Sequence, residues 1–329
     1  MNNAAMNKAV QKAVQPRFRG RATLPPRSKM HYPYNIEREY TRIVRAYMAL
    51  LNEALAAHLP ALRRQMDEAR AGMRHDAYDE FGELLYNIKD VIMNMFSRVS
   101  RSFERQATAF NLEGKLGRIA TQANNWSVSQ WRRIVHDTLG INILEDYYKG
   151  EFFRHELVKW VDRNVGLIKS VPQETLTDMR NIVEDSWRQG ALNKDIARQL
   201  EKTYEIKRSK AEFWARDQMA KLNGEINKQQ QKDAGVDEYI WSTSRDERVR
   251  GNPSGKWSNA KYSHYAMEGK RCDWNNSTIY YNKKKGKWDE RDPGWVQKHP
   301  KEDYRCRCVA APVFNLPGLS LPWEGGWDD

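Results

Sequence analysis

Residues 209–250, SKAEFWARDQMAKLNGEINKQQQKDAGVDEYIWSTSRDERVR, contain the point at which the chain changes from helix to strand. Apolar residues recur at helical spacing from Ala211 to Ile226, and Gly235 follows where such a helix is expected to end. The next eight residues, VDEYIWST, alternate between polar and apolar side chains, which is typical of a strand. The stretch therefore predicts a helical part before residue 235 and a sheet-containing part after it.

The region from Pro33 to Gly235 has the periodicity of successive amphipathic helices. Apolar residues at helical spacing predict one helix after Pro33, a second from Asp76 to about residue 110, and a third that contains Trp131 and is interrupted at Gly140. Short loops between these segments predict a helical bundle or long helical hairpins.

Four further signals predict where helices begin or end within this region. Pro60 and Pro172 are each expected in the first turn of a helix, and Gly190 at the end of the second one. Asn193 is expected to cap a short helix, and Ser209 to begin a separate, longer one.

The segment after Gly235 is rich in loops and tryptophan. The run TIYYNKKKGKW (278–288) predicts a polar hairpin. Seven tryptophans lie in this part of the chain: Trp241, Trp257, Trp274, Trp288, Trp295, Trp323 and Trp327. The predicted fold class is therefore α+β, with a mainly α-helical N-terminal two-thirds and a small, loop-rich α+β C-terminal domain.

The net charge of +12 is unevenly distributed along the 329 residues. Residues 1–30 contain no Asp or Glu, which predicts a basic N-terminal arm that fits a polyanion such as nucleic acid, or an acidic protein surface. The alternative is a solvated, disordered tail, which can also become ordered on contact. The candidate contact residues of the arm are Lys8, Lys12, Arg17, Arg19, Arg21, Arg27 and Lys29.

Several protein classes are disfavoured by composition. The chain has no run of 18 or more apolar residues, so no membrane span is expected, and its N-terminus lacks the apolar core of a secretory signal. Three cysteines do not make a disulfide framework. We expect a soluble protein that is made in a reducing cytosol.

Residues 172–313 carry a series of motifs in one order. A helix opens at VPQET, a later helix contains the pair Ala215-Arg216, and a strand ends in YIWSTSRDERVR. SHYAMEGK, RDPGW and HPKEDYRCRCVAAPV follow. This order resembles the phage Mu F-like head-morphogenesis family, also called the minor head protein family. The resemblance marks as structural motif residues Arg216, Trp241, Thr243, Asp246, Val249, Arg250 and Gly269.

The resemblance implies a domain order and a function. The expected parts are a basic arm (1–32), a helical domain (33–170), a Mu F-like head-morphogenesis domain (171–313) and a C-terminal tail (314–329). The implied protein is a structural minor capsid protein of a tailed-phage virion, not an enzyme. It acts in head assembly, and in DNA packaging or ejection. The implied partners are the portal protein, capsid or scaffolding proteins and packaged double-stranded DNA, without a membrane. The implied location is the capsid interior near the portal, and the host cytoplasm during assembly.

Asp246 and Arg250 directly follow the predicted strand. They are interpreted either as part of an active site or as an Asp–Arg pair that fixes the loop, and we favour the pair because a guanidinium is a good partner for a partly buried carboxylate.

The cysteines and two histidines form a candidate metal-binding set. Side chains at i and i+2 of a strand share one face, so Cys306 and Cys308 can address one ion, with further ligands from His264, Cys272 and His299. This set would take a structural zinc. The alternative, which we favour, is that the thiols are free and fill the core, so that no cofactor is bound.

Two other functions use the same residues. A Cys–His pair can act as a nucleophile and its base, and a His–Cys metal site can serve a metal-dependent nuclease that acts during packaging. The chain shows no further sign of an oxyanion hole or a His-Asn-His-like order, so both enzymes are disfavoured. A plain nucleic-acid-binding module is the third function considered.

Overall fold

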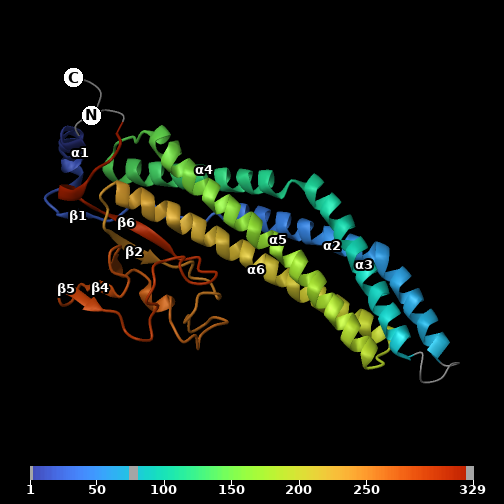
Figure 1. Cartoon of the computed structure of the whole chain (residues 1–329). Coiled ribbons are helices and arrows are strands. Elements are labelled where there is room, and N and C mark those ends of the chain that lie inside the picture. The colour runs from blue at the N-terminus through green and yellow to red at the C-terminus, as the bar shows by residue number, and fades with distance from the viewer. Residues whose placement is uncertain (1–2, 74–80, 324–329) are drawn as a thin grey trace. The chain divides into compact units, whose positions relative to one another are not determined.

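The computed structural model describes residues 3–73 and 81–323, which form six α-helices and a six-stranded antiparallel sheet (Figure 1). The helices are α1 (Asn3–Phe18), α2 (Tyr34–Met73), α3 (Phe81–Phe110), α4 (Leu112–Leu139), α5 (Glu151–Arg188) and α6 (Asn193–Asp233). The strands are β1 (Thr23–Leu24), β2 (Glu238–Ser242), β3 (Arg271–Asp273), β4 (Ile279–Asn282), β5 (Lys287–Glu290) and β6 (Val309–Asn315). The predicted α+β class is confirmed. The expected helix start at Asp76 and the end of the tail, residues 324–329, lie outside the described residues.

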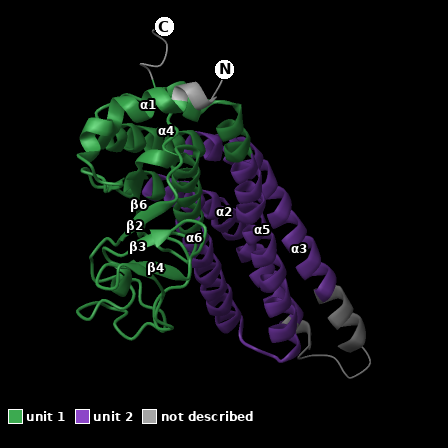
Figure 2. Cartoon of the chain, turned by 90° about the vertical axis from the view of Figure 1, so that its left-hand side faces the viewer, with its two compact units in different colours: residues 1–37, 120–158, 217–329 green, residues 38–119, 159–216 purple. Residues whose placement is uncertain are grey.

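The chain divides into two compact units, each assembled from segments that are distant in sequence (Figure 2). Unit 1 comprises residues 1–37, 120–158 and 217–329, and unit 2 comprises residues 38–119 and 159–216. The division into four successive domains that the sequence suggests stays a prediction.

Unit 2 consists of long helices that lie side by side (Figure 2). Its interior is mainly apolar and aromatic: Met48 and Leu51 are fully buried, and the rings of Tyr47 and Phe103 pack 5.5 Å apart. The hydroxyl of Tyr40 donates a hydrogen bond to Asn164 Oδ1 at 3.0 Å, which satisfies a buried polar group. Among the helices of the described residues, none has both the length and the apolar character that a membrane crossing requires.

Three of the helix boundaries predicted from sequence are wrong. Pro60 lies inside α2 and Pro172 inside α5, far from the first turn of either helix. A proline removes one backbone hydrogen bond, but Val171 before Pro172 and Met179 after it are both buried and hold α5 as one helix. Ser209 begins no helix, because no Gly or Pro interrupts residues 205–215 and α6 continues through them.

Unit 1 contains the sheet, with strand order β1-β6-β2-β3-β4-β5. Strand β2, predicted within residues 236–243, pairs with β6 along its whole length, from Glu238 opposite Val313 to Ser242 opposite Val309. The predicted hairpin is confirmed as β4 and β5. Gly235 ends the turn after α6 at φ +68°, and a Cβ there would collide with the Gly318 carbonyl oxygen, so only glycine fits.

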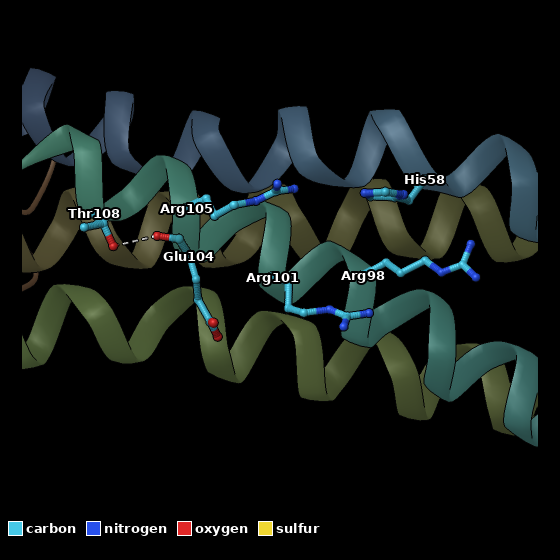
Figure 3. A pocket seen from close by; sticks show the side chains of 6 residues that line it. All are labelled: His58, Arg98, Arg101, Glu104, Arg105 and Thr108. Atoms are coloured by element: carbon cyan, nitrogen blue, oxygen red, sulfur yellow. Dashed lines mark hydrogen bonds between the residues drawn. The ribbon is translucent and has the colours of Figure 1, made fainter.

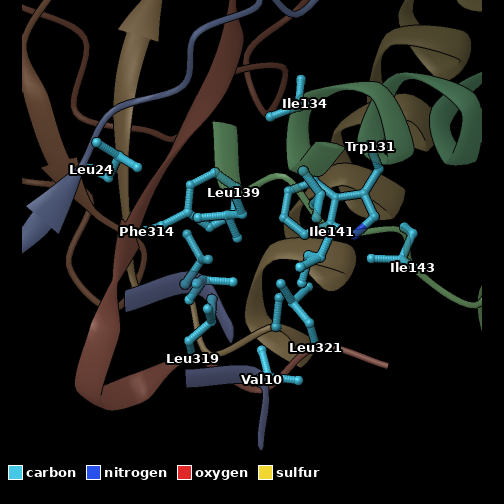
Figure 4. Close-up of a cluster of buried hydrophobic side chains, with 14 of the residues drawn as sticks. Val10, Leu24, Trp131, Ile134, Leu139, Ile141, Ile143, Phe314, Leu319 and Leu321 are labelled. Carbon is cyan, nitrogen blue, oxygen red and sulfur yellow. The ribbon is translucent and has the colours of Figure 1, made fainter. Parts of the chain in front are cut away.

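The basic arm is ordered from residue 3 and belongs to the core of unit 1. Val10, Val14 and Phe18 are spaced four residues apart along α1 and are fully buried with Trp131 and Phe314 in one apolar cluster (Figure 4). Strand β1 then pairs with the end of β6. The alternative of a solvated, disordered tail is therefore wrong for this segment, because its apolar face has a partner to pack against.

Candidate functional site

Three of the five candidate metal ligands meet inside unit 1. His264 lies in the loop between β2 and β3, where its backbone N–H donates to the Arg250 carbonyl oxygen at 3.0 Å. Cys306 and Cys308 lie just before β6, so their position follows from the pairing of β6 with β2. All three side chains are at least 96% buried. The cluster formed by His264, Cys306 and Cys308 is called the His–Cys–Cys cluster below.

The distances within the cluster are short. His264 Nδ1 lies 3.4 Å from Cys306 Sγ and 3.7 Å from Cys308 Sγ. One ligand atom from each residue falls within 4.8 Å of the other two. All three cysteines are free thiols, so the cluster is not a disulfide.

The other imidazole nitrogen of His264 is held by a carboxylate. His264 Nε2 lies 3.2 Å from Asp303 Oδ2. Arg250 donates from Nη1 to the same carboxylate at 2.5 Å and from Nη2 to the Tyr304 carbonyl oxygen at 2.7 Å, and Lys298 adds a contact at 3.2 Å. The carboxylate therefore fixes the orientation of the imidazole ring, and Arg250 fixes the carboxylate.

The electrostatics of the cluster follow from these contacts. Burial pushes the pKa of Cys306 upward, but hydrogen bonds from Cys308 and His264 bring it well below its ordinary value. Burial alone would lower the pKa of His264, yet the hydrogen bonds to Asp303 and Cys306 raise it. The hydrogen bond from His264 holds the pKa of Asp303 well below its usual range, despite partial burial. Without a metal, the cluster therefore favours a thiolate at Cys306 beside a positively charged imidazole.

The order Cys306–His264–Asp303 is also that of a nucleophile, its base and a carboxylate that orients the base. Such a site works only if a substrate carbonyl or phosphate reaches the sulfur. Cys306 is 3% exposed and His264 is 2% exposed, so the sulfur and the ring are covered by protein. The geometry therefore suits a structural role or the binding of a small ion better than attack on a substrate.

The two other candidate ligands, Cys272 on β3 and His299 in the loop between β5 and β6, lie outside the cluster. Cys272, on β3, pairs across the sheet with Tyr239, and burial raises its pKa to about 11. His299 Nδ1 lies 3.0 Å from the Tyr239 hydroxyl, and burial lowers its pKa to about 4. The set of five ligands predicted from the sequence contains two residues too many, because Cys272 and His299 pack around Tyr239 instead.

The Asp246–Arg250 pair expected from sequence is not the pair that forms. Asp246 accepts a hydrogen bond from Arg307 at 2.8–2.9 Å, whereas Arg250 turns to Asp303. Asp246 also accepts the backbone N–H of Arg248 at 3.0 Å, so it caps its own turn. Both residues do tie the loop after β2 to the segment before β6, but through partners that the local sequence did not indicate.

The remaining motif residues have structural roles. Trp241 is fully buried on β2, and Val249 is buried in the following turn. The backbone N–H of Thr243 donates to the Glu268 carboxylate at 2.6 Å. Gly269 adopts φ +72° and donates its N–H to the Trp241 carbonyl oxygen at 2.8 Å. In unit 2, Arg216 contacts Glu212 at 3.3 Å one turn earlier on α6.

Sequence reasoning missed three residues that organise this region. Asp303 and Arg307 flank the cysteines within the HPKEDYRCRC segment, and their charges were the signal available. Lys301 is fully buried, which lowers its pKa to about 7, and its ammonium group bonds to Asn223 Oδ1. Nothing in the sequence distinguishes Lys301 from an exposed lysine.

The charged side chains of the arm face solvent. Lys8, Lys12, Arg17, Arg19, Arg21, Arg27 and Lys29 are all exposed. Within the described residues, none of these seven forms an ion pair. The arm therefore combines a buried apolar face with a free basic face.

A second basic feature, not foreseen from sequence, lies within unit 2. Arg98, Arg101 and Arg105 extend from one face of α3 into an open hollow of about 610 Å³ that His58 also lines (Figure 3). All three arginines are exposed, and none forms an ion pair with another of the described residues. The spacing R-x-x-R-x-x-x-R was the available signal, because residues three and four apart share a helix face.

Comparisons with known proteins agree with the motif order. Residues 177–311 match the family model described as phage Mu protein F like protein. An uncharacterized protein of Haemophilus influenzae is 32% identical over 152 residues, which make up 46% of this chain and 28% of that protein. The chain thus matches little more than a quarter of that relative's length. No solved structure gives a significant match. The resemblance indicated by the motif order is confirmed: residues 177–311 are similar to the phage Mu F-like family, which suggests phage head morphogenesis.

Proposed function

We propose that this chain is a minor head protein of a tailed phage that binds the portal protein during head assembly and contacts the packaged DNA. The observation that carries the proposal is the family match over residues 177–311, a segment whose signature residues act as internal ties of the fold. Residues that serve as internal ties are expected in a structural protein. Capsid or scaffolding proteins are further proposed partners, and the capsid interior is the proposed location.

The exposed charge of the arm supports the DNA contact. Its seven basic side chains face solvent and form no ion pair with the described residues, while Val10, Val14 and Phe18 anchor α1 at the start of the arm. A cation that neutralises a phosphate releases a counterion, so the contact should weaken steeply with salt. The exposed arginines of α3 offer a second site for phosphates or acidic side chains.

The DNA contact is tested by changing charge without touching the core. Replacing Arg19, Arg21 and Arg27 with Gln should weaken binding to duplex DNA. It should also lower the slope of log affinity against log salt by about one unit per lost contact. The matched control replaces three exposed lysines of the β4–β5 turn, Lys283, Lys284 and Lys285, with Gln and should bind like the wild type. Equal loss in both variants would contradict a specific role for the arm.

The portal contact is tested by co-expressing the full chain with the portal protein of the same phage. Co-elution in size-exclusion chromatography is expected, as is a block in head formation when the gene is deleted from the phage. Separate elution together with normal heads would overturn the proposal. The nuclease alternative predicts that the pure chain cuts plasmid DNA with a divalent metal ion. The proposed structural role predicts intact plasmid.

A further inference from the structure

We propose that His264 Nδ1, Cys306 Sγ and Cys308 Sγ bind one zinc ion, with a water molecule in the fourth position. The site is independent of the proposed portal and DNA contacts, since it lies entirely among buried residues of unit 1. Its role is structural: it joins the loop between β2 and β3 to the segment that precedes β6.

The two sulfur–nitrogen distances in the cluster fit a tetrahedral zinc site. A sulfur and a nitrogen that bind the same zinc ion lie about 3.5–3.6 Å apart, given bond lengths of about 2.3 and 2.0–2.1 Å. The two observed distances from His264 Nδ1, 3.4 Å to Cys306 and 3.7 Å to Cys308, fall on either side of this value. Two thiolates and an imidazole are also ligands that favour zinc over magnesium or calcium.

The two sulfurs converge on one imidazole nitrogen. A single imidazole nitrogen offers one N–H or one lone pair, yet the sulfurs of Cys306 and Cys308 both approach His264 Nδ1. Only one of them can form a full hydrogen bond with it. A metal ion at the centre would contact all three atoms.

The indole N–H of Trp241 is a second, independent observation. It is buried, it meets no oxygen or nitrogen acceptor among the described residues, and its hydrogen-bonding interaction is with the Cys308 sulfur. A zinc-bound thiolate carries negative charge and accepts N–H donors of this kind, which stabilise ligating sulfurs in metal sites. The proposed ion therefore also explains why this buried N–H points at a sulfur.

The environment around the ligands is complete. Histidines that bind zinc usually donate their second ring N–H to a carboxylate, and Asp303 occupies that position at 3.2 Å from His264 Nε2. Binding releases two protons to solvent, one from the Cys308 thiol and one from His264 Nδ1, and the neutral imidazole keeps its proton on Nε2. The zinc ion loses all but one of its waters. The two thiolates balance the charge of the zinc ion, so the ion and its three protein ligands together bury no net charge.

The main experiment measures metal in the full chain, purified without a histidine tag or a chelator. Elemental analysis should find about one zinc per chain. Apo protein titrated with Co²⁺ should bind one equivalent, with the sulfur-to-cobalt charge-transfer absorption of thiolate ligands. No stoichiometric zinc and no such absorption from a folded apo chain would overturn the proposal, and stoichiometric iron in place of zinc would overturn the choice of ion.

Variants test the ligand set. Cys306→Ser and Cys308→Ser should each weaken zinc binding by at least about 100-fold, and Asp303→Asn by about 10–100-fold. The matched control is Cys272→Ser, a buried thiol outside the cluster, which should keep one zinc. Equal loss in the control would overturn the assignment. Circular dichroism identifies any variant that fails to fold, and in that case the cobalt titration of the wild-type chain decides by itself. Portal and DNA binding are measured separately, so failure of either proposal leaves the other standing.

Discussion

The sheet-containing unit and the helical unit of this chain are stabilised by different kinds of contact. In unit 2, long helices satisfy their own backbone hydrogen bonds and bury an apolar face that includes Met48, Leu51 and Ile92. In unit 1, strands of two to seven residues are joined by irregular loops. There, charged side chains hold segments that are distant in sequence, as Arg250 does with Asp303 and Arg307 with Asp246.

This difference explains why the candidate metal-binding residues lie in unit 1. Short strands and loops leave more polar groups to be satisfied by side chains than helices do, so charged and sulfur-containing residues are drawn inward. Tyr239, Trp241 and Trp274 cover them and form the second apolar cluster of the unit, together with the three cysteines. The same packing that stabilises a small sheet thus creates a shielded polar site.

The largest effect is expected where this packing is removed. Trp241→Ala deletes a fully buried side chain at the centre of the sheet and should lower the free energy of unfolding by about 3–5 kcal/mol. The control Trp257→Ala changes a side chain that is 60% exposed and should shift it by no more than about 0.5 kcal/mol. Urea denaturation followed by circular dichroism measures both. Similar losses in the two variants would contradict a sheet that depends on its buried tryptophan.

The next effect concerns the two aspartates that tie loops in unit 1. Asp303→Ala removes the common partner of Arg250, His264 and Lys298, and the lost side chain is only 14% exposed. We expect a loss of about 2–4 kcal/mol, because a half-buried guanidinium and a buried histidine lose their counterion. Asp246→Ala removes a 38% exposed partner of Arg307 and should lose at most about 1 kcal/mol. The reverse order would show that the loop after β2 depends mainly on Asp246.

The helical region was largely predictable from sequence because its signal is local. Glycines at 140, 190 and 235 were correctly expected to end helices, and all three adopt positive φ. Pro60, Pro172 and Ser209 gave wrong helix boundaries. Buried apolar contacts outweigh the local signals that end a helix, and a short stretch of sequence does not reveal such contacts.

The site was only partly predictable because its signals are long-range. Residue chemistry pointed to His264, Cys306 and Cys308, but also to Cys272 and His299, which pack around Tyr239 instead. The arginine partners of Asp246 and Asp303 could not be predicted from the sequence. Nearness in sequence favoured Asp246 with Arg250, whereas the pairing of β6 with β2 brings residues 303–307 to the loop and offers each charge a different partner.

The smallest effect is expected for an ion pair of unit 2. Arg45 donates two hydrogen bonds of 2.9 Å to Glu212, and this contact lowers the pKa of Glu212. A carboxyl group whose pKa is lower in the folded chain stabilises the fold above its unfolded pKa of about 4.3, and this stability is lost as the pH falls through the folded pKa. Because Arg45 is 56% exposed, solvent screens the pair, so Arg45→Ala should cost at most about 1 kcal/mol at neutral pH.

The Arg45–Glu212 pair of unit 2 and the buried Trp241 of unit 1 should respond differently to salt and acid. The loss caused by Arg45→Ala should shrink in high salt and disappear once the pH falls below the lowered pKa of Glu212, because the partner carboxylate is then protonated. The loss caused by Trp241→Ala should persist under both conditions, since it reflects a cavity and not a charge. Urea titrations of the two variants at neutral and acidic pH, each in low and high salt, measure this. An Arg45→Ala penalty that survived both treatments would mean that the arginine stabilises unit 2 by packing its aliphatic stem on the helix surface. In that case a solvent-screened charge would not be what stabilises unit 2 at this position, and the contrast with the buried charges of unit 1 would not hold there.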